Sequence, residues 1–311
     1  MSEAIDVAAL FERRISYPDP GARQRLGNLV GIDDHKQRLS KILGLLVNPT
    51  GLEAWAKKYH PDADLLLDTV LRRPPLVILA GDVGSGKTEL AETIGDAVAR
   101  AEDIDVTLLP LSLSTRGQGK VGEMTQLLTA AFDYTANEAA KLKANGRSRG
   151  ALILLVDEAD ALAQSREAAQ MHHEDRSGVN AFIRGIDRLS NNRLPAAVIM
   201  CTNRLSALDP AVRRRAAEML AFDRPDDGRR REVLSPRLMS LGFSNSQVET
   251  MIGLTGARTK QDASFTFSDL TQRLLPAIVL DAYPGRAVDP QRAIEIARAM
   301  APTPPFRDGP A

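Results

Sequence analysis

The octapeptide GDVGSGKT, from Gly81 to Thr88, contains the residue types that bind phosphate. It matches the pattern G-x-x-x-x-G-K-[ST] at every fixed position, and it follows an apolar segment and precedes a helical one. Glycines allow backbone N–H groups to surround a phosphate, and the N-terminus of a helix adds partial positive charge. The Lys87 ammonium reaches the β- and γ-phosphates, and the Thr88 hydroxyl can bind Mg²⁺. The sequence therefore predicts a nucleoside triphosphate site with magnesium.

Polar residues also end two further apolar segments. In LILLVDEAD the adjacent acids Asp157 and Glu158 follow five apolar residues, and VIMCTNR places Asn203 after the next segment. An acid at the carboxyl end of a strand faces the crevice in which open α/β sheets bind ligands. We expect Asp157 to hold Mg²⁺ through water and Glu158 to orient and deprotonate the attacking water. Asn203 is expected to hydrogen-bond that water or the γ-phosphate.

Strands and helices must alternate to position these residues. Apolar segments rich in β-branched residues predict strands over 76–80, 106–113, 151–158, 196–203 and 218–223. Nearly continuous apolar strands are typical of a parallel sheet that is buried on both faces. Helical patterns lie between them, over 88–101, 124–144 and 177–189. The sequence therefore predicts an α/β fold with a parallel five-stranded sheet and helices on both faces.

The pattern changes after about residue 226. Four helical segments follow without any strand pattern, over 228–242, 244–256, 267–283 and 289–300. The last residues are rich in proline and glycine, which predicts disorder. We therefore expect a short N-terminal segment (1–28), a large α/β nucleotide-binding domain (29–226), a small α-helical domain (227–300) and a disordered tail (301–311).

Composition excludes several classes of protein. The 311 residues include 40 Lys and Arg and 40 Asp and Glu, so no overall basic field attracts nucleic acid or a membrane surface. A single cysteine, Cys201, rules out an intrachain disulfide and fits a reducing compartment. The N-terminal residues do not resemble a signal peptide, and no apolar run approaches the roughly 18 residues of a membrane helix. We expect a soluble cytosolic protein.

Taken together, the motifs resemble those of AAA+ ATPases over about residues 31–299. GDVGSGKT and LLVDEADAL match the two Walker motifs, CTNR matches the sensor-one strand, and LVGIDDHKQRL resembles the adenine-side segment. This resemblance implies an ATPase that uses ATP and Mg²⁺, with the 227–300 domain as its lid. It implies magnesium ligation by Thr88 and Asp157. It implies nucleotide contacts by Val30, Gly31, Ile32, Gly81, Asp82, Val83, Gly84, Ser85, Gly86, Lys87, Thr88 and Glu89.

The segment SFTFSDLTQRL, residues 264–274, resembles the lid motif of that family, G-F-S-G-A-D-L. It agrees at Phe265, Thr266, Asp269 and Leu270, whereas Ser264 and Phe267 replace glycines. Ser268 stands where some relatives have a sensor arginine, and Arg273 is a distant substitute. The second sensor is therefore unassigned.

LDPAVRRRAAEML, residues 208–220, resembles the arginine-finger helix of the family. Alignment with that motif makes Arg214 and Arg215 the fingers, which reach the γ-phosphate held by a neighbouring copy. Successive helical residues turn by about 100°, so three adjacent arginines cannot all point one way. We therefore expect a structural or solvent role for Arg213. The resemblance implies a ring, most commonly a homohexamer, and a monomer that hydrolyses ATP poorly.

A loop that grips substrate in the central pore usually has the form aromatic-x-Gly-Glu in AAA unfoldases. Here Lys120 replaces the aromatic residue, followed by Val121, Gly122 and Glu123. A flexible surface loop is the alternative interpretation. The segment QMHHED (170–175) falls where a second pore loop would lie, and its adjacent histidines lack the spacing of a metal pair.

The single-ring organisation and the segments KVGEMTQ and SDLTQRL resemble bacterial relatives of the meiotic and checkpoint ATPases that remodel HORMA-domain proteins. The resemblance implies an anti-phage system with cyclic oligonucleotides. Its substrate would be a HORMA protein that is pulled open while bound to a nucleotidyltransferase. About thirty residues precede the ATPase core, which is too few for a domain. Recognition is therefore expected from the ring, that short segment or a separate partner.

Two alternatives remain. A nucleic-acid motor or clamp-loader-type ATPase is disfavoured by the neutral charge and by the lack of a helix-turn-helix or basic arm. A non-enzymatic nucleotide switch is disfavoured by Glu158 and the finger arginines, because a switch does not need a complete set of hydrolytic residues. Stimulation of ATP hydrolysis by DNA would favour the motor, and nucleotide binding without turnover would favour the switch.

Overall fold

The computed structural model describes residues 10–112, 123–143, 148–162, 173–257 and 262–305. The chain divides into two compact units, each of which is described by itself. The α/β unit comprises Met1–Leu26, Asp34–Ala80 and Thr88–Ala221. The helical unit comprises Gly27–Asp33, Gly81–Lys87 and Phe222–Ala311, and therefore includes the phosphate loop.

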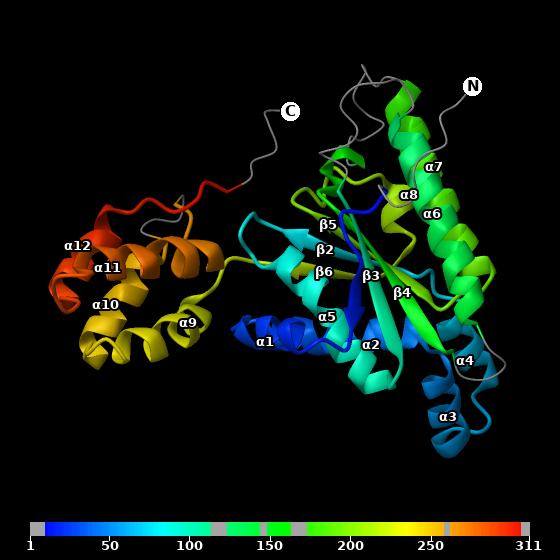
Figure 1. Cartoon of the computed structure of the whole chain (residues 1–311), viewed down its shortest axis with the longest axis horizontal. Helices are drawn as coiled ribbons and strands as arrows, with labels where there is room; N and C mark the ends of the chain where they lie inside the picture. The colour runs from blue at the N-terminus through cyan, green and yellow to red at the C-terminus, as the bar shows by residue number, and fades with distance from the viewer. Residues whose placement is uncertain (1–9, 113–122, 144–147, 163–172, 258–261, 306–311) are drawn as a thin grey trace. The chain divides into compact units, whose positions relative to one another are not determined.

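A six-stranded sheet forms the centre of the α/β unit (Figure 1). Its strands are β1 (Ile15–Tyr17), β2 (Leu76–Gly81), β3 (Asp105–Ser112), β4 (Gly150–Asp157), β5 (Ala196–Thr202) and β6 (Ala216–Phe222). They lie in the order β1-β3-β4-β5-β2-β6. The pairs β3–β4, β4–β5 and β5–β2 are parallel, as the near-continuous apolar sequences predicted.

All five predicted strands are present, and the α/β fold class is confirmed. The prediction of five strands was wrong by one, because β1 pairs antiparallel with β3 at the edge of the sheet. This strand has only three residues, Ile15, Ser16 and Tyr17, and a proline follows it. Such a segment is too short to show the alternation by which strands are recognised.

Helices cover both faces of this sheet (Figure 1). On one face, α6 (Glu123–Leu142) and α7 (His173–Asn191) pack against alternate strand residues. Those strand residues include Leu76, Ile78, Leu152, Leu154, Ala196 and Val198. The intervening residues Val77, Ile153 and Ile199 are equally buried and point to the opposite face, since side chains alternate along a strand. There α2 (Asp33–Val47) and α5 (Lys87–Glu102) meet at their C-terminal ends, where Asn48, the residue after α2, donates from Nδ2 to Glu102 Oε2 at 2.9 Å.

Several short helices of the chain had not been predicted. They are α1 (Pro20–Asn28), α3 (Thr50–Tyr59) and α4 (Asp64–Leu71), whereas the single turn α8 (Pro210–Arg213) lies within the segment that was predicted as the arginine-finger helix. Helix α1 buries only Ala22, α3 buries only Ala56, and α4 buries no residue completely. The apolar stripe on which a helix prediction depends is therefore missing from these segments.

The helical unit contains the four helical segments that the sequence predicted. These are α9 (Asp227–Met239), α10 (Asn245–Thr255), a π-helical turn (Asp269–Leu274) that continues into α11 (Leu275–Ala282), and α12 (Pro290–Ala299). Their apolar residues form one core, which includes Leu234, Leu238, Met251, Phe265, Leu270 and Ile278. Side-chain caps fix the helix starts: Asp226 accepts the Arg229 N–H, and Ser244 and Gln247 form a capping box.

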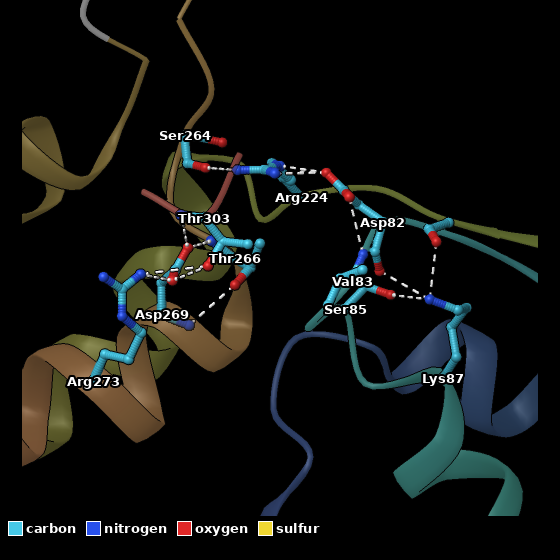
Figure 2. Close-up of polar contacts among 11 residues, drawn as sticks. Asp82, Val83, Ser85, Lys87, Arg224, Ser264, Thr266, Asp269, Arg273 and Thr303 are labelled. Atoms are coloured by element: carbon cyan, nitrogen blue, oxygen red, sulfur yellow. Dashed lines mark hydrogen bonds and ion pairs between the residues drawn. The ribbon is translucent and has the colours of Figure 1, made fainter. Parts of the chain in front are cut away.

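Asp269 ties the segment after α12 to this core (Figure 2). Its fully buried carboxylate accepts the Thr303 hydroxyl at 2.6 Å and the Thr303 and Thr266 N–H groups at 3.0 and 2.9 Å. It also pairs with Arg273 at 2.5 Å. Burial raises the pKa of Asp269, but the hydrogen bonds from Thr303, Thr266 and Arg273 outweigh burial and lower that pKa to about 2.

Asp269→Asn should therefore lower the free energy of unfolding by about 2 kcal/mol at pH 7, because the pKa lies about two units below its ordinary value. A depressed pKa gives stability that is present above about pH 4 and is lost as the pH falls toward 2. The difference in thermal stability between wild type and variant should shrink over that interval. The exposed Asp262→Asn serves as the control, and a difference that stays constant from pH 5 to pH 2 would contradict this role of the charge.

Candidate nucleotide-binding site

The phosphate loop, residues 81–86, follows β2 and precedes α5. Its lysine, Lys87, is the first residue of α5 and is 6% exposed. Lys87 Nζ donates to the carbonyl oxygens of Gly81 and Asp82 at 2.9 and 2.8 Å and lies 3.4 Å from Ser85 Oγ (Figure 2). The loop thus holds its cation with its own oxygen atoms, at the N-terminus of a 16-residue helix. Such a position suits an anion, so the residues fit a phosphate group.

Gly84 places this loop directly against the lid motif within the helical unit. Its φ of +74° is a conformation that side chains disfavour. A Cβ atom added to Gly84 would lie 2.8 Å from Ser268 Cβ and 2.9 Å from Thr266 Oγ1. The Ser268 N–H donates to the Gly84 carbonyl oxygen at 3.0 Å. Only glycine permits this approach, which explains the residue type at this position beyond its role near phosphate.

A mostly apolar pocket opens beside the loop in the same unit. Val30 and Ile32 line it together with Ser85 and Gly86 of the loop. The remaining lining residues are Asn28, Leu29, Val233, Arg237, Phe267 and Thr271. Gly31 has a φ of +81° and lies against the Phe267 ring, to which an added Cβ would approach within 3.2 Å. The pocket therefore has the composition that a planar base requires, next to the loop that fits phosphate.

The structure also locates the other predicted nucleotide ligands. Val83 is 47% exposed, and Asp82 contacts an arginine that is described below. In the α/β unit, Thr88 is exposed in the first turn of α5, and Glu89 lies 3.5 Å from Arg25. These positions do not show which of the four residues contacts a nucleotide, so their roles remain predictions.

The carboxyl ends of three parallel strands meet at one edge of the α/β unit. Ala80 of β2 lies opposite Thr202 of β5, and Val156 of β4 lies opposite Met200. The register brings the segment that ends at Asp157 beside the segment that ends before Asn203, as the sequence predicted.

Glu158 has an unusual backbone conformation at this edge. Its side chain is exposed, and its φ is +51°, which is uncommon for residues other than glycine. Its N–H donates to Asp157 Oδ1 at 2.8 Å, so the first acid holds the backbone of the second. Non-glycine residues in this region cluster at functional sites, where the strain sets the direction of a side chain. Glu158 is thus turned away from the buried strand and presented to solvent.

Asp160, which the sequence reasoning missed, fixes the position of Asn203. It lies in the short 3₁₀ helix Ala159–Leu162. Its Oδ1 accepts the Thr202 hydroxyl at 2.6 Å and the Asn203 N–H at 3.0 Å, and its Oδ2 accepts Asn203 Nδ2 at 3.0 Å. The available signal was a further acid, three residues after Asp157 in the sequence DEAD.

The three consecutive arginines have different environments. Helix α8 ends at Arg213, and Arg214 and Arg215 lie in the turn before β6, so the expectation of one helix through all three was wrong. Arg214 is exposed. Arg215 Nε and Nη2 bind Asp187 of α7 at 2.8 and 3.0 Å, and hydrogen bonding to Asp187 raises the pKa of Arg215. An arginine held by two hydrogen bonds in its own chain differs sharply from an exposed one.

Several predicted features lie outside the described residues. These include the first pore loop with Lys120, Val121 and Gly122, His172 of the second, and the tail from residue 306. In the part of the chain that the structure does describe, no helix has the length and apolar character needed to span a membrane.

Comparison with known proteins gives consistent matches. The family described as "ATPase family associated with various cellular activities (AAA)" matches residues 77–224. CD-NTase-associated protein 6 from Escherichia coli strain MS 115-1 is 67% identical over 300 residues, which cover 96% of both proteins. A chain in the structure of the E. coli MS115-1 HORMA:CdnC:Trip13 complex is 66% identical, with a TM-score of 0.91 over 97% of this chain and 99% of that chain. The structure of Rhizobiales Trip13 is 59% identical, with a TM-score of 0.75 over 95% of this chain and all of that chain.

Proposed function

The chain belongs to the AAA family of ATPases, and from this premise we propose that it is a ring-shaped, ATP-driven remodeller of a HORMA-domain protein. The observation that carries this proposal is the 66% identity over 97% of the chain to a protein solved in a complex with HORMA and CdnC. Identity at that level over nearly the whole length extends beyond the shared ATPase fold. It therefore supports a shared substrate class as well as a shared reaction.

Nucleotide binding by an AAA ATPase follows from the family, and the proposal assigns its contacts. Lys87 and the glycine loop bind the phosphates, and Val30 and Ile32 contact the base. The Thr88 hydroxyl and the Asp157 carboxylate supply the oxygen ligands that Mg²⁺ prefers. A bound magnesium ion would neutralise charge on the phosphates.

The hydrolytic step is assigned to the strand ends of the α/β unit. Glu158, exposed and turned out of the strand, accepts a proton from the attacking water. Asn203 hydrogen-bonds that water or the γ-phosphate. Asp160 is a positioning residue, because it holds both the backbone and the side chain of Asn203.

The exposed Arg214 is assigned as the finger that reaches the nucleotide of a neighbouring copy. Arg215 was predicted as a second finger, and its pairing with Asp187 supports a different role in the resting chain. It fixes the turn that carries Arg214. Residues from two copies then form each site, which requires a homo-oligomeric ring, proposed to be a hexamer.

The remaining proposals concern the substrate and the cell. Lys120, Val121 and Gly122 grip a HORMA protein in the central pore, and this protein regulates a nucleotidyltransferase of an anti-phage system. The ring acts in the bacterial cytoplasm. The domain limits at residues 28, 226 and 300 remain predictions, since the two compact units divide the chain differently and Thr303, beyond the last limit, binds Asp269.

A dissociation experiment tests the proposal. The chain is mixed with ATP and a complex of the HORMA protein and CdnC from E. coli MS115-1, and size-exclusion chromatography follows the complex. We expect ATP-dependent release of CdnC, and no release by Lys87→Ala, because that variant lacks the ammonium that binds the phosphates. ATP hydrolysis that responds to duplex DNA and not to the HORMA complex would contradict the proposal and favour a nucleic-acid motor.

A further inference from the structure

A largely buried ion pair lies inside the helical unit, between the phosphate loop and the lid motif (Figure 2). Asp82 is the second residue of the loop, and its Oδ2 accepts hydrogen bonds from Arg224 Nε at 2.8 Å and Nη2 at 2.6 Å. The Arg224 side chain is only 13% exposed, and the Asp82 side chain is only 15% exposed. Removal of one partner from such a pair leaves a poorly solvated charge behind.

Arg224 also contacts the backbone of the lid motif. Its Nη1 donates to the Ser264 carbonyl oxygen at 2.5 Å. Ser264 directly precedes Phe265, which is 1% exposed in the core of the helical unit. The planar guanidinium therefore binds the loop carboxylate on one side and a fixed backbone oxygen on the other (Figure 2). A lysine ammonium lacks the fork that satisfies both acceptors in one geometry.

The ion pair neutralises a negative charge in the loop that would oppose phosphate binding. A carboxylate in a loop that receives a polyphosphate repels the incoming anion unless another charge offsets it. The backbone of Asp82 contacts the cation of the site, because Lys87 Nζ donates to the Asp82 carbonyl oxygen at 2.8 Å, whereas the Asp82 carboxylate is bound by Arg224. Without Arg224, the charge of the Asp82 carboxylate would remain uncompensated in the loop and would oppose phosphate binding.

The other oxygen of Asp82 supports the same arrangement. Oδ1 accepts the Val83 N–H at 2.9 Å, so the side chain also shapes the turn of the loop. An asparagine keeps this acceptor oxygen and removes the charge. Substitution of Asp82 by asparagine therefore separates the charge of the side chain from its part in the turn.

We infer that Arg224 is a positioning residue for nucleotide binding, which neutralises the Asp82 carboxylate and fixes the phosphate loop to the lid motif at Ser264. This inference rests on the proposed binding of ATP to the loop. It gives the segment after β6 a role in the nucleotide site, 142 residues away from the loop in the sequence.

A set of variants tests this inference by titration of the full chain with a fluorescent ADP analogue. Arg224→Gln should weaken binding about tenfold or more, and addition of Asp82→Asn should restore affinity to within about threefold of wild type. Arg224→Lys should lose less affinity than Arg224→Gln, because it keeps the neutralising charge. Arg231→Gln is the matched control, since Arg231 forms an exposed pair with Glu249 in the same unit and should bind as wild type.

Wild-type affinity in Arg224→Gln, or failure of Asp82→Asn to rescue it, would overturn the inference. Thermal unfolding of each variant shows whether lost binding reflects a lost fold. If Arg224→Gln does not fold, Arg224→Lys, which keeps the neutralising charge, is compared with wild type instead. Lys87→Ala distinguishes failure of the role inferred for Arg224 from failure of the proposed ATP binding. If wild type binds and only Lys87→Ala fails, the role of Arg224 is wrong and ATP binding stands. If wild type does not bind, the proposed function itself fails.

Discussion

Glu158→Gln should lower ATP turnover by about 10²- to 10⁴-fold while ATP remains bound, because an amide cannot accept the proton of the attacking water. The side chain is exposed at the end of β4, so the substitution disturbs no packing. The substitution also leaves the contacts between Lys87 and the phosphate loop unchanged. Phosphate release measures the turnover, and binding of a fluorescent ATP analogue measures the affinity.

The same variant should also accumulate as an ATP-bound ring, which size-exclusion chromatography with light scattering can detect. Glu232→Gln removes an exposed carboxylate from α9 and serves as the matched control. Turnover near the wild-type rate in Glu158→Gln would exclude Glu158 as the general base and leave the acid at the strand end without a catalytic role.

Arg214→Ala should lower the rate of hydrolysis by about 10³- to 10⁵-fold, the range that a finger arginine supplies to phosphoryl transfer. Nucleotide affinity should change much less, since the phosphate loop and the base pocket contain no part of this turn. Arg193→Ala, which removes an exposed arginine of the same unit, should leave both quantities unchanged. A comparable loss in the control, or none in Arg214→Ala, would contradict the assignment.

Local patterns predicted most of the fold. The central strands are apolar on both faces, and this signal survives in the sequence because each residue is buried on one side or the other. Helices α5, α6 and α7 have apolar stripes that pack on the sheet. By contrast, α3 and α4 bury almost nothing, so they have no apolar stripe. Strand β1 has only three residues, which are too few to show a periodic pattern.

The residues of the site were predicted more completely than their connections. Motif spacing indicated Lys87, Glu158 and Asn203, because phosphate binding and hydrolysis require those residue types at those positions. It could not indicate that Asp160 holds Asn203, or that Arg224 holds Asp82, since ion pairs between distant segments depend on the tertiary fold. The different environments of Arg214 and Arg215 likewise depend on Asp187, which lies 28 residues earlier.

Mixing two inactive variants most directly tests whether neighbouring copies share one site. Lys87→Ala lacks the cation of the phosphate loop but keeps Arg214, whereas Arg214→Ala has the opposite defect. If each site combines one loop with the finger of the next copy, an equal mixture should recover about a quarter of wild-type ATPase activity, because one in four head-to-tail interfaces is then complete. Absence of rescue at every ratio, under conditions in which the two variants form mixed rings, would contradict the shared site.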